Sequence, residues 1–96
     1  IEYEYIGATE LDPSDSYATY ALKANKKIVE DNNSRGIYIC GTGFGICMAA
    51  NRCKVVRATR CSNKKEVIAT RKHNNCNVLV LGGRTLKIER HIKSFF

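Results

Sequence analysis

Short apolar runs alternate with amphipathic stretches along the chain, and this alternation constrains the fold more than any other feature of the sequence. The apolar runs read as strands, at residues 1–6, 36–40, 55–61 and 78–81. A stretch with helical spacing follows each of them, at about 13–30, 46–51, 63–71 and 88–96. A strand–helix order repeated in this way is typical of a parallel sheet with helices on both faces. The sequence therefore predicts an α/β fold, a three-layer sandwich with a parallel, Rossmann-like sheet.

The length and charge of the chain limit the partners that it can have. With 96 residues, 44% of them apolar, it forms one small domain, and it contains no run of about 20 apolar residues that could span a membrane. The net charge of +7 suits an anion, either nucleic acid or a phosphorylated metabolite. The densest basic clusters also fit solvated helix faces; they are Lys26-Lys27, Lys64-Lys65 and Arg71-Lys72. Because no recognised nucleic-acid motif accompanies them, we expect no nucleic-acid partner. Because no apolar run is long enough to span a membrane, we expect no membrane partner either.

Cysteine usage bears on the compartment and on metal binding. The five cysteines are an odd number and contain no C-x-x-C pair, which favours free thiols in a reducing compartment and therefore a cytoplasmic protein. A zinc site made of Cys61, His73 and Cys76 can be drawn as an alternative, but it lacks the paired-ligand spacing of zinc sites. We therefore expect no metal, and we expect most of the thiols to be small core residues.

A glycine-rich turn follows the second predicted strand and opens a helix. The backbone N–H groups of Gly41, Gly43 and Gly45 can there point into one concavity and hold an anion. The spacing differs from the G-x-G-x-x-G dinucleotide motif, and the Lys-Ser/Thr of a nucleotide P-loop is missing. Cys40 lies directly before the turn, where such N–H groups would stabilise a thiolate able to act as base or nucleophile. The alternatives are a tight turn without a ligand and a buried cysteine at a strand end.

Further polar residues are expected at the same edge of the sheet, because the carboxyl ends of parallel strands meet there. This edge joins residues 40–45, 61–62 and 82–84. His73 and Asn74 end a predicted helix, and we expect them at this edge too. His73 is either a proton donor poised near neutral pH or a residue that complements the helix dipole. Asn74 suits hydroxyl groups, and Arg84 offers a planar fork for a phosphate.

Five motifs occur in register along nearly the whole chain, and together they are more specific than any one of them. They are Cys40-Gly-Thr-Gly-Phe-Gly-Ile, Ala49-Ala-Asn51, Arg57-Ala58, Arg71-Lys-His73-Asn74 and Leu81-Gly-Gly-Arg84. In these motifs the chain resembles the ribose-5-phosphate isomerase B family, whose relatives include bacterial galactose-6-phosphate and allose-6-phosphate isomerases. The resemblance implies interconversion of ribose 5-phosphate and ribulose 5-phosphate through an enediolate, without metal or redox cofactor.

The resemblance also implies catalytic roles. Cys40 matches the base that moves a proton between C1 and C2 of the open-chain sugar. Gly41, Gly43 and Gly45 match the loop whose amides hold the enediolate, with the Thr42 hydroxyl alongside.

Other residues match groups that bind the substrate. His73 and Asn74 match a pair that assists ring opening and binds sugar hydroxyls, and this pair favours the pentose substrate over galactose 6-phosphate. Arg84 matches an arginine on the phosphate. Tyr17 matches a tyrosine beside the sugar, although Ala18 replaces the proline that usually follows it.

The resemblance extends to assembly and also shows two departures. It implies a homodimer with the site between two subunits. The family opens with a strand that ends in a sugar-binding Asp-His pair, which is absent before Ile1, and its phosphate-binding arginines beyond Phe96 are also absent. We therefore expect residues 1–96 to be a single isomerase domain truncated at both ends, with weak or no activity. The alternatives are a hexose-phosphate isomerase and a non-catalytic module that binds anions or nucleotides.

Overall fold

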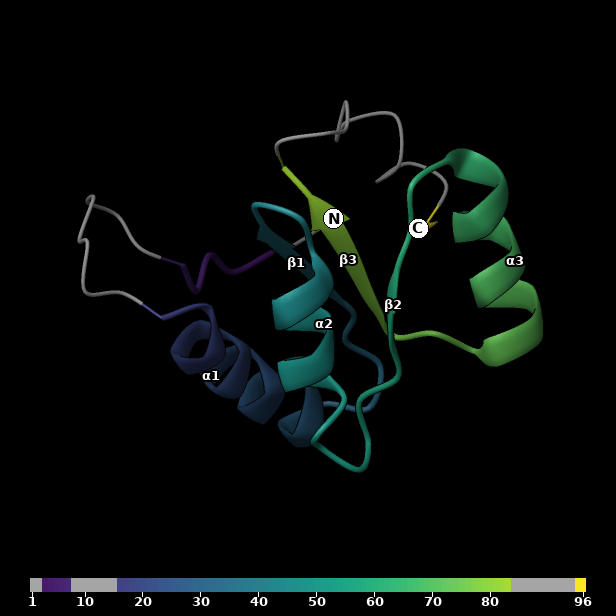
Figure 1. Cartoon of the computed structure of the whole chain (residues 1–96). Helices are drawn as coiled ribbons and strands as arrows, with labels where there is room; N and C mark the ends of the chain where they lie inside the picture. Colours follow the sequence, from purple (N-terminus) through teal and green to yellow (C-terminus); the bar gives the residue numbers. More distant parts are fainter. Residues whose placement is uncertain (1–2, 8–15, 84–94) are drawn as a thin grey trace.

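The computed structural model describes residues 3–7, 16–83 and 95–96. Helices and strands alternate in these residues (Figure 1), as α1 (Tyr17–Glu30), β1 (Gly36–Cys40), α2 (Phe44–Ala50), β2 (Ala58–Arg60), α3 (Lys64–Asn74) and β3 (Val78–Gly82). The three strands are parallel in the order β1-β3-β2, with Gly36 and Ala58 both opposite Val78. The predicted parallel α/β fold is therefore confirmed. Within these ranges no helix is long and apolar enough to cross a membrane.

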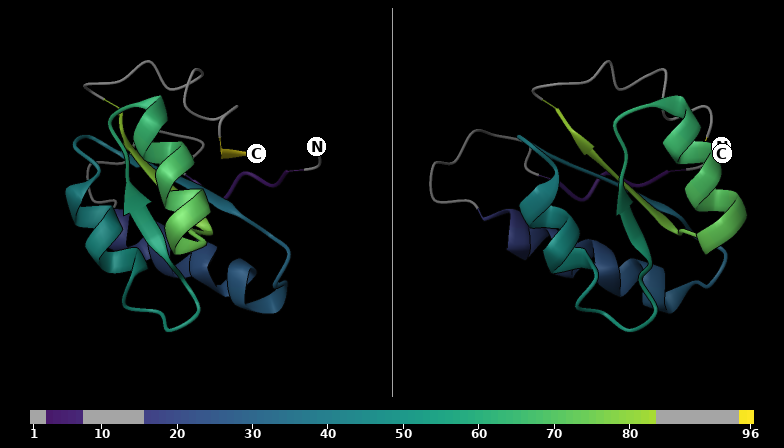
Figure 2. Two further views of the ribbon diagram at one scale, coloured as in Figure 1. Left: turned by 90° about the vertical axis from the view of Figure 1, so that its right-hand side faces the viewer. Right: turned by 45° about the vertical axis from the view of Figure 1, so that its right-hand side comes forward.

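Two apolar clusters separate the layers of the fold. Figures 1 and 2 show α3 on the other side of the sheet from α1 and α2. The central strand β3 is fully buried, and its side chains alternate between the two clusters. Val78 and Val80 pack against α1 and α2, while Leu79 and Leu81 pack in the cluster that includes Val67 of α3. A continuous apolar run in a strand thus reflects burial on both faces, as expected for a parallel sheet.

A buried hydrogen-bond chain ties α1, β1 and α2 together. The Tyr38 hydroxyl donates to Asn25 Oδ1 at 2.7 Å, and Asn25 Nδ2 donates to the Ala50 carbonyl at 3.1 Å. Asn25 is only 3% exposed, so its amide needs both partners. Burial also raises the pKa of the Tyr38 phenol far above its ordinary value, with a smaller contribution from Cys53.

The sequence Asn63-x-x-Glu66 predicts a capped helix start, and the structure of α3 confirms it. Asn63 Oδ1 accepts the Glu66 N–H at 2.9 Å, and Glu66 Oε1 accepts the Ser62 N–H at 2.7 Å, one residue before the N-cap. The helix continues to Asn74 rather than ending near Arg71. Asn75 ends it in the left-handed conformation, with its N–H on a carbonyl of the last turn.

Four other predicted elements differ from the structure or fall partly outside it. Residues 3–6 of the first predicted strand form no strand, and Tyr3 is 91% exposed. Alternation alone makes no strand without a hydrogen-bonding neighbour, and no described strand pairs with this segment. The strand predicted at 55–61 is limited to Ala58–Arg60. Helix α1 begins at Tyr17, after N-cap Ser16. The helix start predicted near residue 13 lies outside the described residues, as does most of the last predicted helix.

Candidate active site at the carboxyl edge of the sheet

The carboxyl ends of the three strands meet at one edge, as predicted from the sequence. Cys40 at the end of β1 lies opposite Gly82 at the end of β3, and β2 ends beside them at Arg60. The Gly83 N–H continues the pairing by donating to the Cys40 carbonyl at 2.8 Å. This edge therefore holds the Cys40 thiol and the glycine-rich turn together.

The Cys40 thiol faces the turn that follows it. Its Sγ atom accepts the Gly43 N–H at 3.2 Å, and the residue is neither fully buried nor exposed. Gly43 has φ 84°, which only glycine adopts without strain, and it is the N-cap of α2. The turn thus directs a main-chain donor at the sulfur, an arrangement that stabilises a thiolate.

Close packing of main chain against main chain shapes the turn. A Cβ atom added to Gly82 would lie 2.6 Å from the Thr42 carbonyl oxygen, and one added to Gly43 would lie 3.2 Å from Gly82 N. The Thr42 hydroxyl accepts the Phe44 N–H at 3.3 Å. Because Gly43 offers no capping side chain, the next first-turn amides of α2 remain as donors for an anion.

Tyr17 lies directly against this turn. A Cβ atom on Gly45 would be 2.7 Å from the Tyr17 ring and 2.8 Å from its hydroxyl oxygen. The side chain is half exposed, so its hydroxyl can reach a ligand at the same edge. The structure therefore brings together Tyr17, Cys40 and the glycine turn.

The prediction that His73 and Asn74 share this edge is wrong for a single chain. Helix α3 follows β2 and runs back across the sheet, so its last turn lies where β3 begins (Figure 1). Both residues are exposed there, at the amino ends of the strands. Arg84, the predicted phosphate ligand, lies outside the described residues.

The remaining cysteines divide by burial. Cys61 and Cys76 are fully buried, which confirms the predicted packing role for these two. Burial raises the pKa of the Cys61 thiol to about 12, with smaller contributions from neighbouring groups, and burial also raises the pKa of Cys47. Among the described residues no group of three potential ligands could hold a metal ion.

Two further motif residues have structural roles that the sequence did not reveal. The Asn51 side chain accepts the Ala58 N–H at 2.8 Å and donates to the Ala58 carbonyl at 2.9 Å, so it pairs with β2 as a strand would. Arg57 donates from Nε to the Asn75 carbonyl at 2.7 Å, which holds the end of α3 to the start of β2. These contacts explain both positions without a ligand.

Sequence reasoning also missed Arg60. Its Nε atom donates to the Thr42 carbonyl at 2.7 Å, and its guanidinium carbon lies 4.2 Å from the centre of the Phe44 ring. The signal that could have found it is its place at the end of a strand, next to a pair of residues already expected at this edge.

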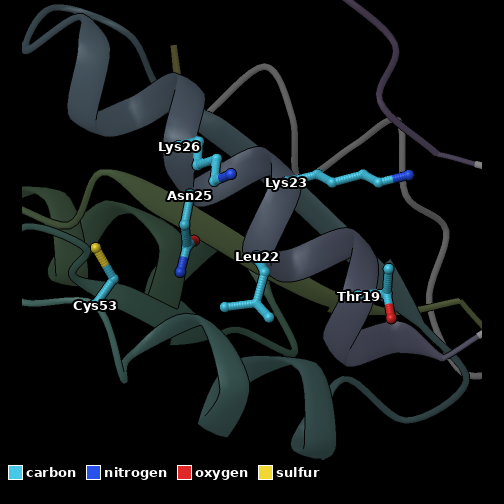
Figure 3. Close-up of a pocket in the computed structure, with 6 residues that line it drawn as sticks. All are labelled: Thr19, Leu22, Lys23, Asn25, Lys26 and Cys53. Atoms are coloured by element: carbon cyan, nitrogen blue, oxygen red, sulfur yellow. The ribbon is translucent and has the colours of Figure 1, made fainter.

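A separate hollow of about 410 Å³ lies along α1 (Figure 3). Leu22 and Asn25 point from α1 towards the segment that carries Cys53, and Thr19, Lys23 and Lys26 complete the lining. None of the predicted site residues lines it. We therefore place the candidate site at the carboxyl edge of the sheet.

Comparisons with known proteins identify the family of the chain. The family model described as Ribose/Galactose Isomerase matches residues 1–95. The chain belongs to this family. A relative named "Probable ribose-5-phosphate isomerase B" in Mycoplasma pneumoniae is 43% identical over 88 residues, which cover 92% of this chain and 58% of the relative. The chain thus spans about three fifths of the length of that relative.

Solved structures of the ribose/galactose isomerase family show the same fold. Ribose-5-phosphate isomerase B of Mycoplasma genitalium, solved with bound ribulose 5-phosphate, superposes with a TM-score of 0.87 at 34% identity, over 94% of this chain and 62% of that one. The ribose 5-phosphate isomerase of Thermotoga maritima gives a TM-score of 0.92 at 37% identity, over 99% and 67%. The parallel α/β fold predicted from the strand–helix alternation is therefore the fold of this family.

Proposed function

We propose that the chain is a sugar-phosphate aldose–ketose isomerase that interconverts ribose 5-phosphate and ribulose 5-phosphate. One observation carries the proposal: Cys40 Sγ lies at the mouth of a glycine turn and accepts the Gly43 N–H at 3.2 Å. A base next to aimed main-chain donors is what proton transfer through an enediolate requires. Family membership and the relatives' names support the same reaction.

The proposed chemistry moves one proton between two carbons and one between two oxygens, and it needs no external oxidant. The Cys40 thiolate removes the C2 proton of the open-chain aldose, and the electron pair forms the C1–C2 double bond while O1 takes up negative charge. The Cys40 thiol then returns the proton to C1, and a proton passes from O2 to O1 to leave the ketose. Turn amides directed at the enediolate oxygen would each stabilise it by about 3 to 4 kcal/mol.

We further propose that the enzyme is a homodimer whose site spans two subunits. Cys40 and the exposed His73-Asn74 pair lie at opposite ends of the strands within one chain. If the pair serves the sugar, as the resemblance implies, a second copy must supply it. Arg84 would bind the phosphate, and Tyr17 would line the sugar pocket beside Gly45.

The cysteines and the net charge of the chain support a cytoplasmic enzyme that acts on an anionic metabolite. All five cysteines are free thiols, as expected in a reducing compartment. The net charge of +7 would attract a sugar phosphate towards the site.

The experiment that tests the function is replacement of the proposed base. In the whole protein, Cys40→Ala should lower kcat for ribose 5-phosphate by about 10²- to 10⁴-fold while the circular dichroism spectrum stays unchanged. Cys53→Ala is the matched control, because Cys53 is a partly buried thiol far along the chain from the turn. Near-normal turnover by the Cys40 variant would refute the assignment of the base.

The same assay decides the substrate class. Ribose 5-phosphate should be turned over faster than galactose 6-phosphate or allose 6-phosphate, the substrates of the family's hexose enzymes. A faster hexose reaction would replace the pentose assignment. Nucleotide binding without turnover of any sugar phosphate would favour a non-catalytic module.

A further inference from the structure

Arg60 connects to Cys40 through a single peptide group. Its Nε atom donates to the Thr42 carbonyl at 2.7 Å, and the N–H of the same peptide, on Gly43, donates to Cys40 Sγ at 3.2 Å. In a trans peptide the C=O and N–H bonds point in opposite directions, and no cis peptide occurs in the described residues. Fixing the carbonyl therefore fixes the direction of the N–H.

The turn itself does not impose this orientation. Gly43 has φ 84° and ψ −12°, the values of the third residue of a type II turn. Glycine also adopts the corresponding type I values without strain, and the two turns differ by a flip of the peptide before that residue. Such a flip would turn the Gly43 N–H away from the sulfur. A contact from outside the turn can therefore favour the observed form.

Arg60 has the contacts needed to select it. Besides the bond to Thr42, its Nη1 atom donates to the Ser62 hydroxyl at 2.9 Å, and its guanidinium lies 4.2 Å from the Phe44 ring centre. Three contacts thus hold the Arg60 side chain in place. A charged donor on the carbonyl also polarises the peptide and strengthens its N–H as a donor.

We propose that Arg60 is a positioning residue, which acts through the Thr42–Gly43 peptide to keep a main-chain donor on the Cys40 sulfur. Its catalytic consequence rests on the proposed isomerase function, in which the Cys40 thiolate is the base. Arg60 itself need not touch the substrate. Its effect is to favour the thiolate and therefore the proton-transfer step.

The test measures Cys40 reactivity separately from turnover. In the folded protein, Arg60→Met should slow alkylation of Cys40 by iodoacetamide at neutral pH by about tenfold, the value of one hydrogen bond to a charged group. Mass spectrometry of the Cys40 peptide gives the rate, and the Cys53 peptide of the same sample serves as reference. Arg57→Met is the matched control, because Arg57 also donates from Nε to a backbone carbonyl at 2.7 Å, at the other end of β2. The control should alter the rate by less than about twofold.

Turnover gives the second measurement. Arg60→Met should lower kcat about as much as it lowers the alkylation rate and leave KM within about twofold, because only the proton-transfer step depends on the thiolate. Arg60→Lys should restore part of both, since lysine keeps the charge but not the planar fork. If Arg60→Met does not fold, Arg60→Lys decides the matter: slower alkylation than in the parent protein supports the proposal, and an equal rate overturns it.

The outcomes separate this inference from the function beneath it. Slower alkylation in a protein that turns over no sugar phosphate would support the positioning role and remove the isomerase. Normal turnover by the parent protein, with alkylation unchanged or faster in folded Arg60→Met, would overturn the positioning role and leave the isomerase in place.

Discussion

Single glycines determine how closely the ends of β1 and β3 approach. The Gly82 α-carbon faces the Thr42 carbonyl with no room for a methyl group between them, whereas a Cβ on Gly83 would meet the end of the Ile39 side chain at 3.2 Å. The first contact is with main chain and cannot yield, while the second is with a side chain that can move. The two adjacent glycines therefore differ in what they allow.

Gly82→Ala should destabilise the protein and displace the turn. The overpacked contact is expected to lower the free energy of unfolding by about 1 to 3 kcal/mol, measured by urea denaturation. Gly83→Ala is the control and should cost less, because the Ile39 side chain can shift. Equal losses for the two variants would contradict the packing argument.

Tyr38→Phe should destabilise the protein, because it removes the hydrogen-bond donor of the buried Asn25 Oδ1 atom. The variant leaves Asn25 Oδ1 buried without the hydroxyl donor, which should lower the free energy of unfolding by about 1 to 3 kcal/mol. Tyr3→Phe, at a side chain that is 91% exposed, should have no measurable effect. The double variant Tyr38→Phe with Asn25→Leu should lose less than the sum of the single losses, since it removes both partners.

The Cys61 thiol should make stability fall at alkaline pH. Its pKa rises from 9.0 to about 12 on burial, so the unfolded chain releases this proton first and binds fewer protons than the folded one. The contribution is complete below pH 9 and is lost as pH rises towards 12. Urea denaturation across this range should show a shallower decline for Cys61→Ala. Val67→Ala, in the same cluster, should shift the curve down without changing its slope.

At the scale of elements, the sequence predicted a helix or strand well where the residues that form it lie next to one another in the chain. The capping pair Asn63 and Glu66 and the apolar run of β3 carry their structural cause within a few residues. The first predicted strand was wrong because pairing depends on a neighbour that alternation does not specify. His73 was assigned to the wrong edge because a helix end takes its position from the direction of the whole helix, not from the residues around it.

Helix α3 offers a test of the capping interpretation. Asn63→Ala should lower the free energy of unfolding by about 1 kcal/mol, because the Glu66 N–H loses its acceptor. Asn63→Gly should lower the free energy of unfolding by only a few tenths of a kcal/mol, since glycine lets water reach the helix end. Thermal or urea denaturation measures both losses. A larger loss of stability for Asn63→Gly than for Asn63→Ala would contradict the capping interpretation.

At the scale of the whole molecule, the candidate site was predictable only in part. Residues contiguous with Cys40 were found from the sequence, because a strand followed by a glycine turn places them together. The contact between Arg60 and Thr42 joins residues 18 positions apart, and no local pattern announces it. The proposed completion of the site by a second subunit has no local signal either, because Cys40 and His73 lie at opposite ends of the strands within one chain.

Mixing two inactive variants tests the proposed site between two subunits. Cys40→Ala and His73→Ala homodimers should each be inactive, and subunit exchange should restore about a quarter of the parent activity, since half of the dimers are mixed and each has one intact site. Activity that stays absent after exchange, verified by native mass spectrometry, would contradict the two-subunit site. Mixing Cys40→Ala with itself is the control.

The close approach of the Thr42 carbonyl to Gly82 means that part of the wall of the candidate site is bare polypeptide backbone. Peptide groups are chemically the same at every position, so mutation can exchange the side chains nearby without exchanging these groups. Sequence change can thus vary the size and charge of the side chains around the candidate site while its peptide groups stay constant.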